Sequence, residues 1–339
     1  LDWSGYFIDL VALSLVSDSM IMSEMENREY YHFGLETRDC ANNEFLGAMI
    51  DRFIGSDTYT QRDLGFKIIP KLNSVCRCND VELKQQLILA FIGQCDINET
   101  LDMVEQAHQN QIKIVDDVIQ NNMDTILSCG QNNLIVFASD DVPRSYSGLL
   151  AGKIKTLCDN KPTIVGSIKD DIMIGSLRSP IPLREELDNN ELVDFASGHD
   201  CSCGVGIQVD NIQALVDYYN TIEISYTPHI DVLKSYSIKS IPTRLFGLFE
   251  PYNALWGCGV NKPKFYIKNV TFTPSDWSIM GKNKRTLKLH KESIDIMIFN
   301  CLKKDKEDLQ LGYYENDIFI IEPSNNKLQM DCVGELSIN

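Results

Sequence analysis

The 339-residue sequence contains no apolar run near the roughly 18 residues that a membrane span requires. Its apolar first segment, Gly5 to Val16, includes Asp9 and has no basic flank, so it does not fit a signal peptide. Internal repeats and low-complexity segments are absent as well. The chain begins at Leu1 instead of a methionine, and we therefore expect that upstream sequence was removed or never included.

The sequence is also poor in basic residues. It has 31 Lys and Arg against 48 Asp and Glu, a net charge of −17, which argues against a surface that binds nucleic acid everywhere. Residues 261–291 are the exception, because they hold eight basic residues and Asp276 as their one acid. This basic island has a net charge of +7, and the rest of the chain carries −24, so the island requires a local explanation.

The eleven cysteines are scattered and odd in number, which favours a reducing, cytoplasmic compartment over a disulfide framework. Two C-x-C pairs occur, Cys76 with Cys78 and Cys201 with Cys203, and His199 lies close to the second pair. Zinc sites usually separate paired cysteines by two or more residues. We interpret these cysteines as small buried thiols, with metal binding as the less favoured alternative.

A composition of 44% hydrophobic and 23% charged residues is typical of a globular protein, and the length predicts two or three domains. Residues 6–16 predict a buried helix that ends near Ser17 and Asp18. Two or three further helices are expected up to residue 95, with turns at 55–56 and 79–80. Helical spacing over residues 102–127 predicts a long amphipathic helix that could join two domains.

After Gly130 the pattern changes to alternating strands and helices, which predicts a compact α/β domain of about 100 residues. The expected strands are 134–138, 163–165, 172–174 and 205–209, and the expected helices are 147–157, 183–195 and 211–219. Beyond residue 258, five short strands in about 80 residues indicate a small barrel or OB-fold.

Four stretches in order resemble the RecJ branch of the DHH phosphoesterase superfamily. The first is Asp9 to Asp18 with Glu26-Asn27-Arg28, similar to the last metal-binding motif of that family. The second is Phe66 to Arg77, which contains a Pro-x-x-Asn-x-x-x-Arg pattern. The third runs from Ser147-Gly148 through 161–165 and 175–179 to Ser197-Gly198-His199, where the family normally has Gly-Gly-His; the fourth is 256–265.

The resemblance implies an α/β protein in five parts. These are the C-terminal part of a DHH phosphoesterase domain (1–100), a connecting helix (101–128), a DHH-associated domain (129–228), a linker (229–258) and an OB-fold domain (259–339). It further implies a 5′-to-3′ single-stranded DNA exonuclease that releases 5′-mononucleotides.

Phosphodiester hydrolysis of this kind commonly uses two divalent metal ions, and hard ions such as Mn²⁺ or Mg²⁺ prefer carboxylate ligands helped by histidine. The resemblance makes Asp18 a catalytic metal ligand. The Asp-x-Asp and Asp-His-His motifs of the family do not occur in the sequence. We therefore expect the remaining ligands to lie on a missing N-terminal half, and this chain alone to be inactive.

The resemblance also implies a set of nucleic-acid contacts, because guanidinium groups and small-residue turns suit phosphate oxygens. Plain surface or core roles remain alternatives for Arg178 and His199, and the aromatics of the basic island could equally be barrel core. The predicted contacts are Asn73, Arg77, Ser176, Arg178, Ser179, Gly198 and His199, with Lys282, Lys284, Arg285 and Lys288 in the basic island.

The expected partner is single-stranded DNA, and a single-strand binding protein is a further candidate. Two other functions stay open: a catalytically inactive replication scaffold of the same superfamily, and a phosphodiesterase for small oligonucleotides. The drift from the family wording is compatible with a viral or otherwise divergent source.

Overall fold

The computed structural model describes residues 7–222, 231–281, 284, 286–299, 301, 309, 312–315, 318–321 and 328–335. The chain divides into two compact units. The first consists of Leu1–Ser19 with Glu29–Pro228, and the second of Met20–Arg28 with His229–Asn339. No helix within these described residues is both long enough and apolar enough to cross a membrane.

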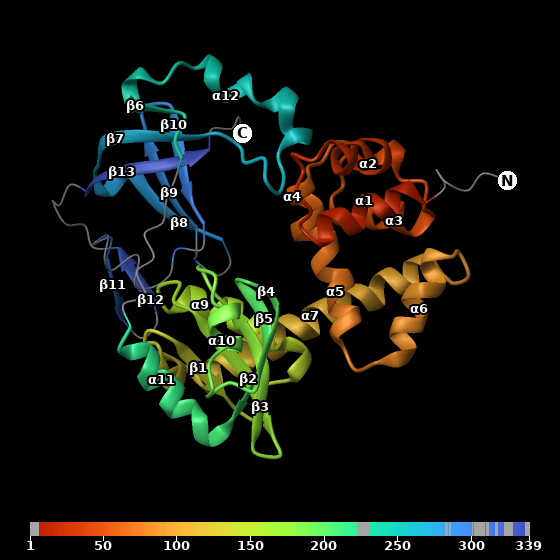
Figure 1. Cartoon of the computed structure of the whole chain (residues 1–339). Coiled ribbons are helices and arrows are strands. Elements are labelled where there is room, and N and C mark those ends of the chain that lie inside the picture. The colour runs from red at the N-terminus through yellow and green to blue at the C-terminus, as the bar shows by residue number, and fades with distance from the viewer. Residues whose placement is uncertain are drawn as a thin grey trace. The chain divides into compact units, whose positions relative to one another are not determined.

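The N-terminal part of the chain is helical (Figure 1). Side-chain caps mark several helix starts, since Asn43, Asp80 and Asp96 each accept a hydrogen bond from a backbone N–H three residues further on. The helices are α1 (Ile8–Ser17), α2 (Met25–Leu35), η1 (Arg38–Cys40), α3 (Glu44–Phe53), α4 (Gln61–Asp63), α5 (Ile69–Arg77), α6 (Val81–Phe91), α7 (Ile97–Asn121) and α8 (Met123–Cys129).

Helix α1 confirms the helix expected over residues 6–16. Its Asp9 is fully buried, and the two carboxylate oxygens accept hydrogen bonds from the backbone N–H groups of Leu10 (2.8 Å) and Asn43 (2.6 Å). Asn43 is the N-cap residue of α3. A buried carboxylate needs such donors, so this pair of bonds fixes α1 against the start of α3.

One continuous helical stretch runs from Gln61 to Arg77, but its middle turn is a π-helix, η2 (Leu64–Ile68). The turn directly precedes Pro70, whose ring in a regular α-helix would press on the carbonyl of Phe66. Widening the turn relieves that clash. The stretch ends with Arg77 as the last residue of α5.

The long connecting helix is shorter at its end than the sequence predicted. Helix α7 starts at Ile97, ends at Asn121, and is followed by the separate helix α8. Asn122 interrupts the two with φ −116° and ψ 18°, and its Nδ2 donates to the carbonyl of Val118 at 2.9 Å. An asparagine side chain that bonds to the backbone in this way competes with the helical hydrogen bonds, which explains why the helical stretch predicted over 102–127 is divided into two helices.

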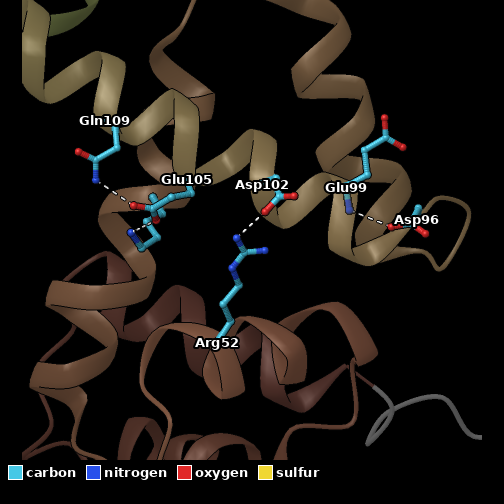
Figure 2. Close-up of polar contacts among 7 residues, drawn as sticks. Arg52, Asp96, Glu99, Asp102, Glu105 and Gln109 are labelled. Carbon is cyan, nitrogen blue, oxygen red and sulfur yellow. Dashed lines mark hydrogen bonds and ion pairs between the residues drawn. The ribbon is translucent and has the colours of Figure 1, made fainter.

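The N-terminal half of α7 is held by ion pairs to the neighbouring helices (Figure 2). Arg52 of α3 pairs with Asp102, and Lys71 of α5 pairs with Glu105. Gln109 donates a further hydrogen bond of 2.8 Å to Glu105. Burial works to raise the pKa of Glu105, but the bonds from Lys71 and Gln109 outweigh it and leave the pKa below its ordinary value.

A carboxylate with a lowered pKa stabilises the fold above the ordinary pKa of about 4.5, and this contribution disappears as the pH falls through the lowered value. We therefore expect Glu105→Gln to lower the thermal unfolding temperature at pH 7, with the difference from the wild type shrinking below about pH 4. Melting curves of both proteins from about pH 3 to pH 7 check this. A difference that is constant over the range would contradict the role of the ionised carboxylate.

Five strands form one mixed sheet in the order β1-β2-β3-β5-β4. Only the pairing of β1 with β2 is parallel among the described strands of this sheet; the other three pairings are antiparallel. The strands are β1 (Ile135–Ala138), β2 (Thr163–Lys169), β3 (Ile172–Arg178), β4 (Phe195–His199) and β5 (Ser202–Gln208). The alternation of strands and helices predicted for this region is confirmed at all four expected strands.

The helix predicted over residues 183–195 was wrong. Helix α10 covers only Arg184–Asp188, and the edge strand β4 starts at Phe195. Asp188 accepts a hydrogen bond from the backbone N–H of Ala196 (3.0 Å), and Asn190 accepts one from Leu192 (3.0 Å). These short polar side chains take up backbone donors outside a helix and so end it early.

The sheet packs an apolar core on each side. On one side, Ile164, Leu177 and Val205 lie in a core completed by α10 and by α11 (Ile212–Asn220). On the other side, Phe137 and Val165 lie in a core completed by α7, α8 and by α9 (Ser147–Leu157). Helix α9 has the bounds that the sequence predicted.

The second unit contains three small sheets in its described part, with strand orders β10-β9-β8, β11-β12 and β13-β7-β6. The five predicted strands are present, and β6, β8 and β11 were not foreseen. The OB-fold barrel itself stays a prediction. The elements are β6 (Lys234–Ser237), η5 (Ile238–Ser240), α12 (Arg244–Leu248), η6 (Glu250–Leu255), β7 (Lys264–Phe272), β8 (Trp277–Met280), β9 (Thr286–Lys291), β10 (Ile294–Ile298), β11 (Gly312–Glu315), β12 (Ile318–Ile321) and β13 (Leu328–Glu335).

Candidate phosphate-binding site

Arg178, the last residue of β3, lies against the start of helix α9. A Cβ atom built on Gly148, the second residue of α9, would come within 2.5 Å of its Nη2 atom. The other terminal nitrogen, Nη1, donates to the carbonyl of Leu177 at 2.7 Å. Glycine at position 148 therefore allows a guanidinium group to approach the helix terminus, and this contact fixes the direction of the side chain.

The positive charge of a second guanidinium group, that of Arg77, acts on Arg178. Burial lowers the pKa of Arg178, and the positive charge of Arg77 at the end of α5 lowers it further. Among the described residues, no carboxylate forms an ion pair or hydrogen bond with either arginine. Two like charges held together without a counter-charge favour an anion as ligand, because an anion removes both the repulsion and the cost of desolvation.

The N-terminus of α9 completes the cationic surroundings. No side chain caps this helix, and the N–H of its first residue, Ser147, donates to the carbonyl of Arg144, so what the terminus offers an anion is the positive end of the helix dipole. Its first residue, Ser147, is buried, and its Oγ lies 2.9 Å from Oγ of Ser176. A helix N-terminus with two guanidinium groups and hydroxyl groups is the combination that binds phosphate in proteins.

One row of residues crosses all five strands on the α9 side of the sheet. Its first two members are buried under α9, and the other three are small, with Ser176 and Gly204 half-buried and Ser197 exposed. Beyond α9, this row of the sheet is thus free of large side chains. The row consists of Phe137, Val165, Ser176, Gly204 and Ser197.

His199 lies two strands away from Arg178, towards the same end of the sheet. His199 pairs with Ser202 of β5. At the same end of the sheet, just beyond β3, the N–H of Ser179 donates to the carbonyl of Cys201 (2.9 Å). His199 and Gly198 are both exposed. Gly198 has φ +136°, and a Cβ atom at this position would lie 3.0 Å from the Cα atom of Cys203, so the turn into His199 requires glycine.

Two other predicted contacts lie close in sequence to the arginines. Asn73 is half-buried and sits one turn before Arg77 on α5, which places both on one face of the helix. Ser179 is buried, and its hydroxyl group bonds to the backbone of Ile181 in both directions, at 2.6 Å and 3.1 Å. The structure thus gives the Ser179 side chain a part in closing a turn, and its contact with nucleic acid stays a prediction.

Asp18 is the C-cap residue of α1 and is exposed. Within the described residues, no three His, Cys, Asp or Glu side chains come together in a group that could hold a metal ion. The residues that the structure describes therefore do not themselves build a two-metal site. The interpretation of the C-x-C cysteines as buried thiols holds for Cys203 and is wrong for Cys76, which is exposed.

The basic island is described only in part, because Lys282 and Arg285 lie outside the described residues. Lys284 follows the turn at Gly281, and both have positive φ values, 50° and 85°. Lys288 pairs with Asp295 at 2.7 Å. The aromatic residues considered for base stacking are mostly core: Phe265, Phe272 and Trp277 are buried.

Sequence reasoning missed Gly148 and Ser147 as parts of the site. Their position at the start of a predicted helix, among small residues, was the available signal, since that is where a phosphate meets free backbone N–H groups. No sequence pattern indicated that the charge of Arg77 acts on Arg178, because the two residues are 101 positions apart in the sequence.

No protein-family profile matches the sequence, and no curated protein matches it. Two solved structures of RecJ from Thermus thermophilus are similar to the chain. The complex with Mn²⁺ gives a TM-score of 0.70 at 16% identity, covering 88% of this chain and 45% of that one. The complex with Mg²⁺ gives 0.71 at 15%, covering 100% and 50%. A structure of exonuclease RecJ bound to manganese gives 0.50 at 16%, covering 65% and 55%.

This chain therefore spans about half the length of the RecJ chains that it matches. At these identities the likeness concerns the fold. The chain has a RecJ-like fold, with a helical N-terminal part, a mixed five-stranded sheet and several smaller sheets.

Proposed function

We propose that the chain is the part of a RecJ-like nuclease that holds the 5′ phosphate of single-stranded DNA. The observation that carries this proposal is the guanidinium group of Arg178 against Gly148 at the start of α9, with the positive charge of Arg77 acting on it and no carboxylate partner for either arginine among the described residues. The resemblance in fold to RecJ supports it. A terminal phosphate carries more negative charge than a phosphodiester and offers three oxygens, so it suits a site with several converging donors.

In the proposed mechanism this chain binds and orients the DNA. Arg77 and Arg178 grip the terminal phosphate, Ser176 and Ser147 offer hydroxyl groups, and His199 lies beside the path of the strand. In the complete nuclease, Mn²⁺ or Mg²⁺ ions would activate the water that attacks the phosphodiester. Asp18 is proposed as one ligand, with the others on residues outside this chain, and no hydrolytic step is assigned to the residues described here.

The second unit is proposed to bind single-stranded DNA by itself through its basic island, in an OB-fold. The charge of residues 261–291 supports this, and each phosphate neutralised on a single strand should add about 0.7 to the slope of log affinity against log salt. A single-strand binding protein is the further proposed partner.

The proposal is tested by measuring the affinity of the purified chain for 5′-phosphorylated and 5′-hydroxyl oligothymidylates by fluorescence anisotropy. The phosphorylated strand is expected to bind more tightly. Arg178→Ala should weaken its binding by roughly 10- to 100-fold, the effect of about 1.5–3 kcal/mol for one lost charge-assisted bond, and should change binding of the hydroxyl strand much less.

Arg184→Ala is the matched control. It removes the same charge from the same unit, but Arg184 already pairs with Asp200 at 3.4 Å and should leave the preference for the phosphate intact. Equal losses on both DNA strands in Arg178→Ala would assign Arg178 to general backbone binding and would contradict recognition of the 5′ end.

A further inference from the structure

Phe195 is an aromatic residue on the surface of the sheet that the phosphate site does not use. It opens the edge strand β4 and is 40% exposed, although most large apolar residues of this sheet are buried. Its ring lies directly against the backbone of its cross-strand partner Gly206, because a Cβ atom at Gly206 would come within 2.2 Å of Cε1 of the ring. One surface of the ring is thus supported by the strand while the side chain stays open to solvent.

The ring is on the same side of the sheet as the phosphate site. Side chains alternate along a strand, and Ala196 points into the core on the α11 side. Phe195 and Ser197 therefore point to the opposite side, where Ser197 lies in the row that contains Gly204 and Ser176. A Cβ atom at Gly204 would meet only the backbone oxygens of Ser197 (3.7 Å) and Gly175 (4.0 Å), so no side chain lies within 4 Å of this point of the sheet.

The separation fits a short piece of a nucleotide chain. Phe195 is two strands from β3 and two residues from the row of Ser176, and strands lie about 4.8 Å apart with a rise of about 3.3 Å per residue. The backbone of Phe195 is therefore roughly 12 Å from that of Ser176 and, because Arg178 lies two residues further along β3, roughly 16 Å from that of Arg178. A strand whose terminal phosphate is held by the arginines can place one of its first bases over this ring.

We propose that Phe195 is a stacking platform for a base near the 5′ end of the bound single strand. The inference rests on the proposed function, since the phosphate site supplies the charge that brings the strand to this surface. Every base has a flat aromatic surface, so a lone exposed ring gives affinity without sequence preference. Arg178 and Arg77 then hold the terminal phosphate, and Phe195 positions the chain that follows it.

The experiment uses the whole chain and a series of 5′-phosphorylated oligothymidylates in which one of the first four nucleotides lacks its base. Phe195→Ala is expected to weaken binding of the complete oligonucleotide by roughly 5- to 100-fold, the range for loss of one base–aromatic contact. In the wild type, removing the base at one position should cost about as much. In Phe195→Ala, removing that same base should cost nothing further.

Phe195→Leu and Phe195→Trp separate stacking from packing on Gly206. Leucine covers the glycine without an aromatic surface and should bind weakly, whereas tryptophan should bind at least as well as the wild type. If the ring only covers Gly206, as aromatic residues do for sheet glycines, Phe195→Leu would bind like the wild type and the proposal would be overturned.

The stacking role of Phe195 and the proposed function can be disproved separately. A wild-type chain that prefers the 5′ phosphate but shows the same losses for missing bases with and without Phe195 would overturn the stacking platform and leave the proposed function standing. A wild-type chain without any preference for the 5′ phosphate would overturn both.

Discussion

Replacement of both Arg77 and Arg178 by glutamine is expected to abolish the preference of the chain for a 5′ phosphate. Each lost charge-assisted contact should cost about 1.5–3 kcal/mol, so the two together should weaken binding of the phosphorylated strand by roughly 10²- to 10⁴-fold. Titration of the double variant and of both single variants with the phosphorylated and hydroxyl strands provides the measurement. The single effects need not add, because both groups act on one phosphate.

The same variants should fold at least as well as the wild type. In the absence of a ligand, burial and Arg77 together disfavour the charge of Arg178, and the substitutions remove this repulsion. Inorganic phosphate should raise the melting temperature of the wild type and leave that of the double variant unchanged. A double variant that still melts higher in phosphate would show that the anion binds elsewhere.

The largest expected effect on stability comes from Gly175 in the middle of β3. A Cβ atom at this position would lie 2.2 Å from the carbonyl oxygen of Val165 and 2.7 Å from the Cα atom of Gly166, its partner on β2. The obstacles are backbone atoms that cannot turn aside. Gly175→Ala is therefore expected to lower the free energy of unfolding by about 2–4 kcal/mol. Amide hydrogen exchange over residues 163–178, with thermal unfolding, would measure it.

Gly152→Ala is the matched control for this prediction. Gly152 is inside helix α9, and an added Cβ atom would meet nothing within 4 Å. Alanine has less backbone freedom than glycine in the unfolded chain and so loses less conformational entropy when the helix forms. This variant should therefore be more stable by about 0.5–1 kcal/mol. If both alanine variants changed stability alike, the close approach of β2 and β3 would not be the cause.

Local signals in the sequence predicted much of the fold. The bounds of α9 were read correctly, because Ser147 and Gly148 mark a start and the apolar spacing continues to Leu157. Asp80 and Asn43 show why helix starts are readable, since a capping side chain bonds within its own turn. Strands β2, β3 and β5 were likewise found as short apolar runs.

Features that depend on distant residues were harder to predict. The short α10 depends on Asp188 accepting from Ala196 eight positions away, a bond that exists only once β4 has folded back. The sequence named Arg77, Ser176 and Arg178 as candidate contacts, but the approach of Arg178 to Gly148 depends on how β3 and α9 pack. The position of the Phe195 ring likewise depends on a residue distant in sequence, its cross-strand partner Gly206.

The π-helical turn of residues 64–68 has a consequence for how the length of this chain can vary. In an α-helix each residue advances the direction of the side chains by about 100°. One inserted residue would therefore rotate all helical side chains on one side of the insertion away from the residues they pack against. A π turn accommodates one extra residue without passing that rotation on to α5. An added Cβ atom at Gly65 would meet nothing within 4 Å. Homologous chains can therefore gain or lose a residue here while Arg77 keeps its direction, and an alignment gap at this turn would record such an event.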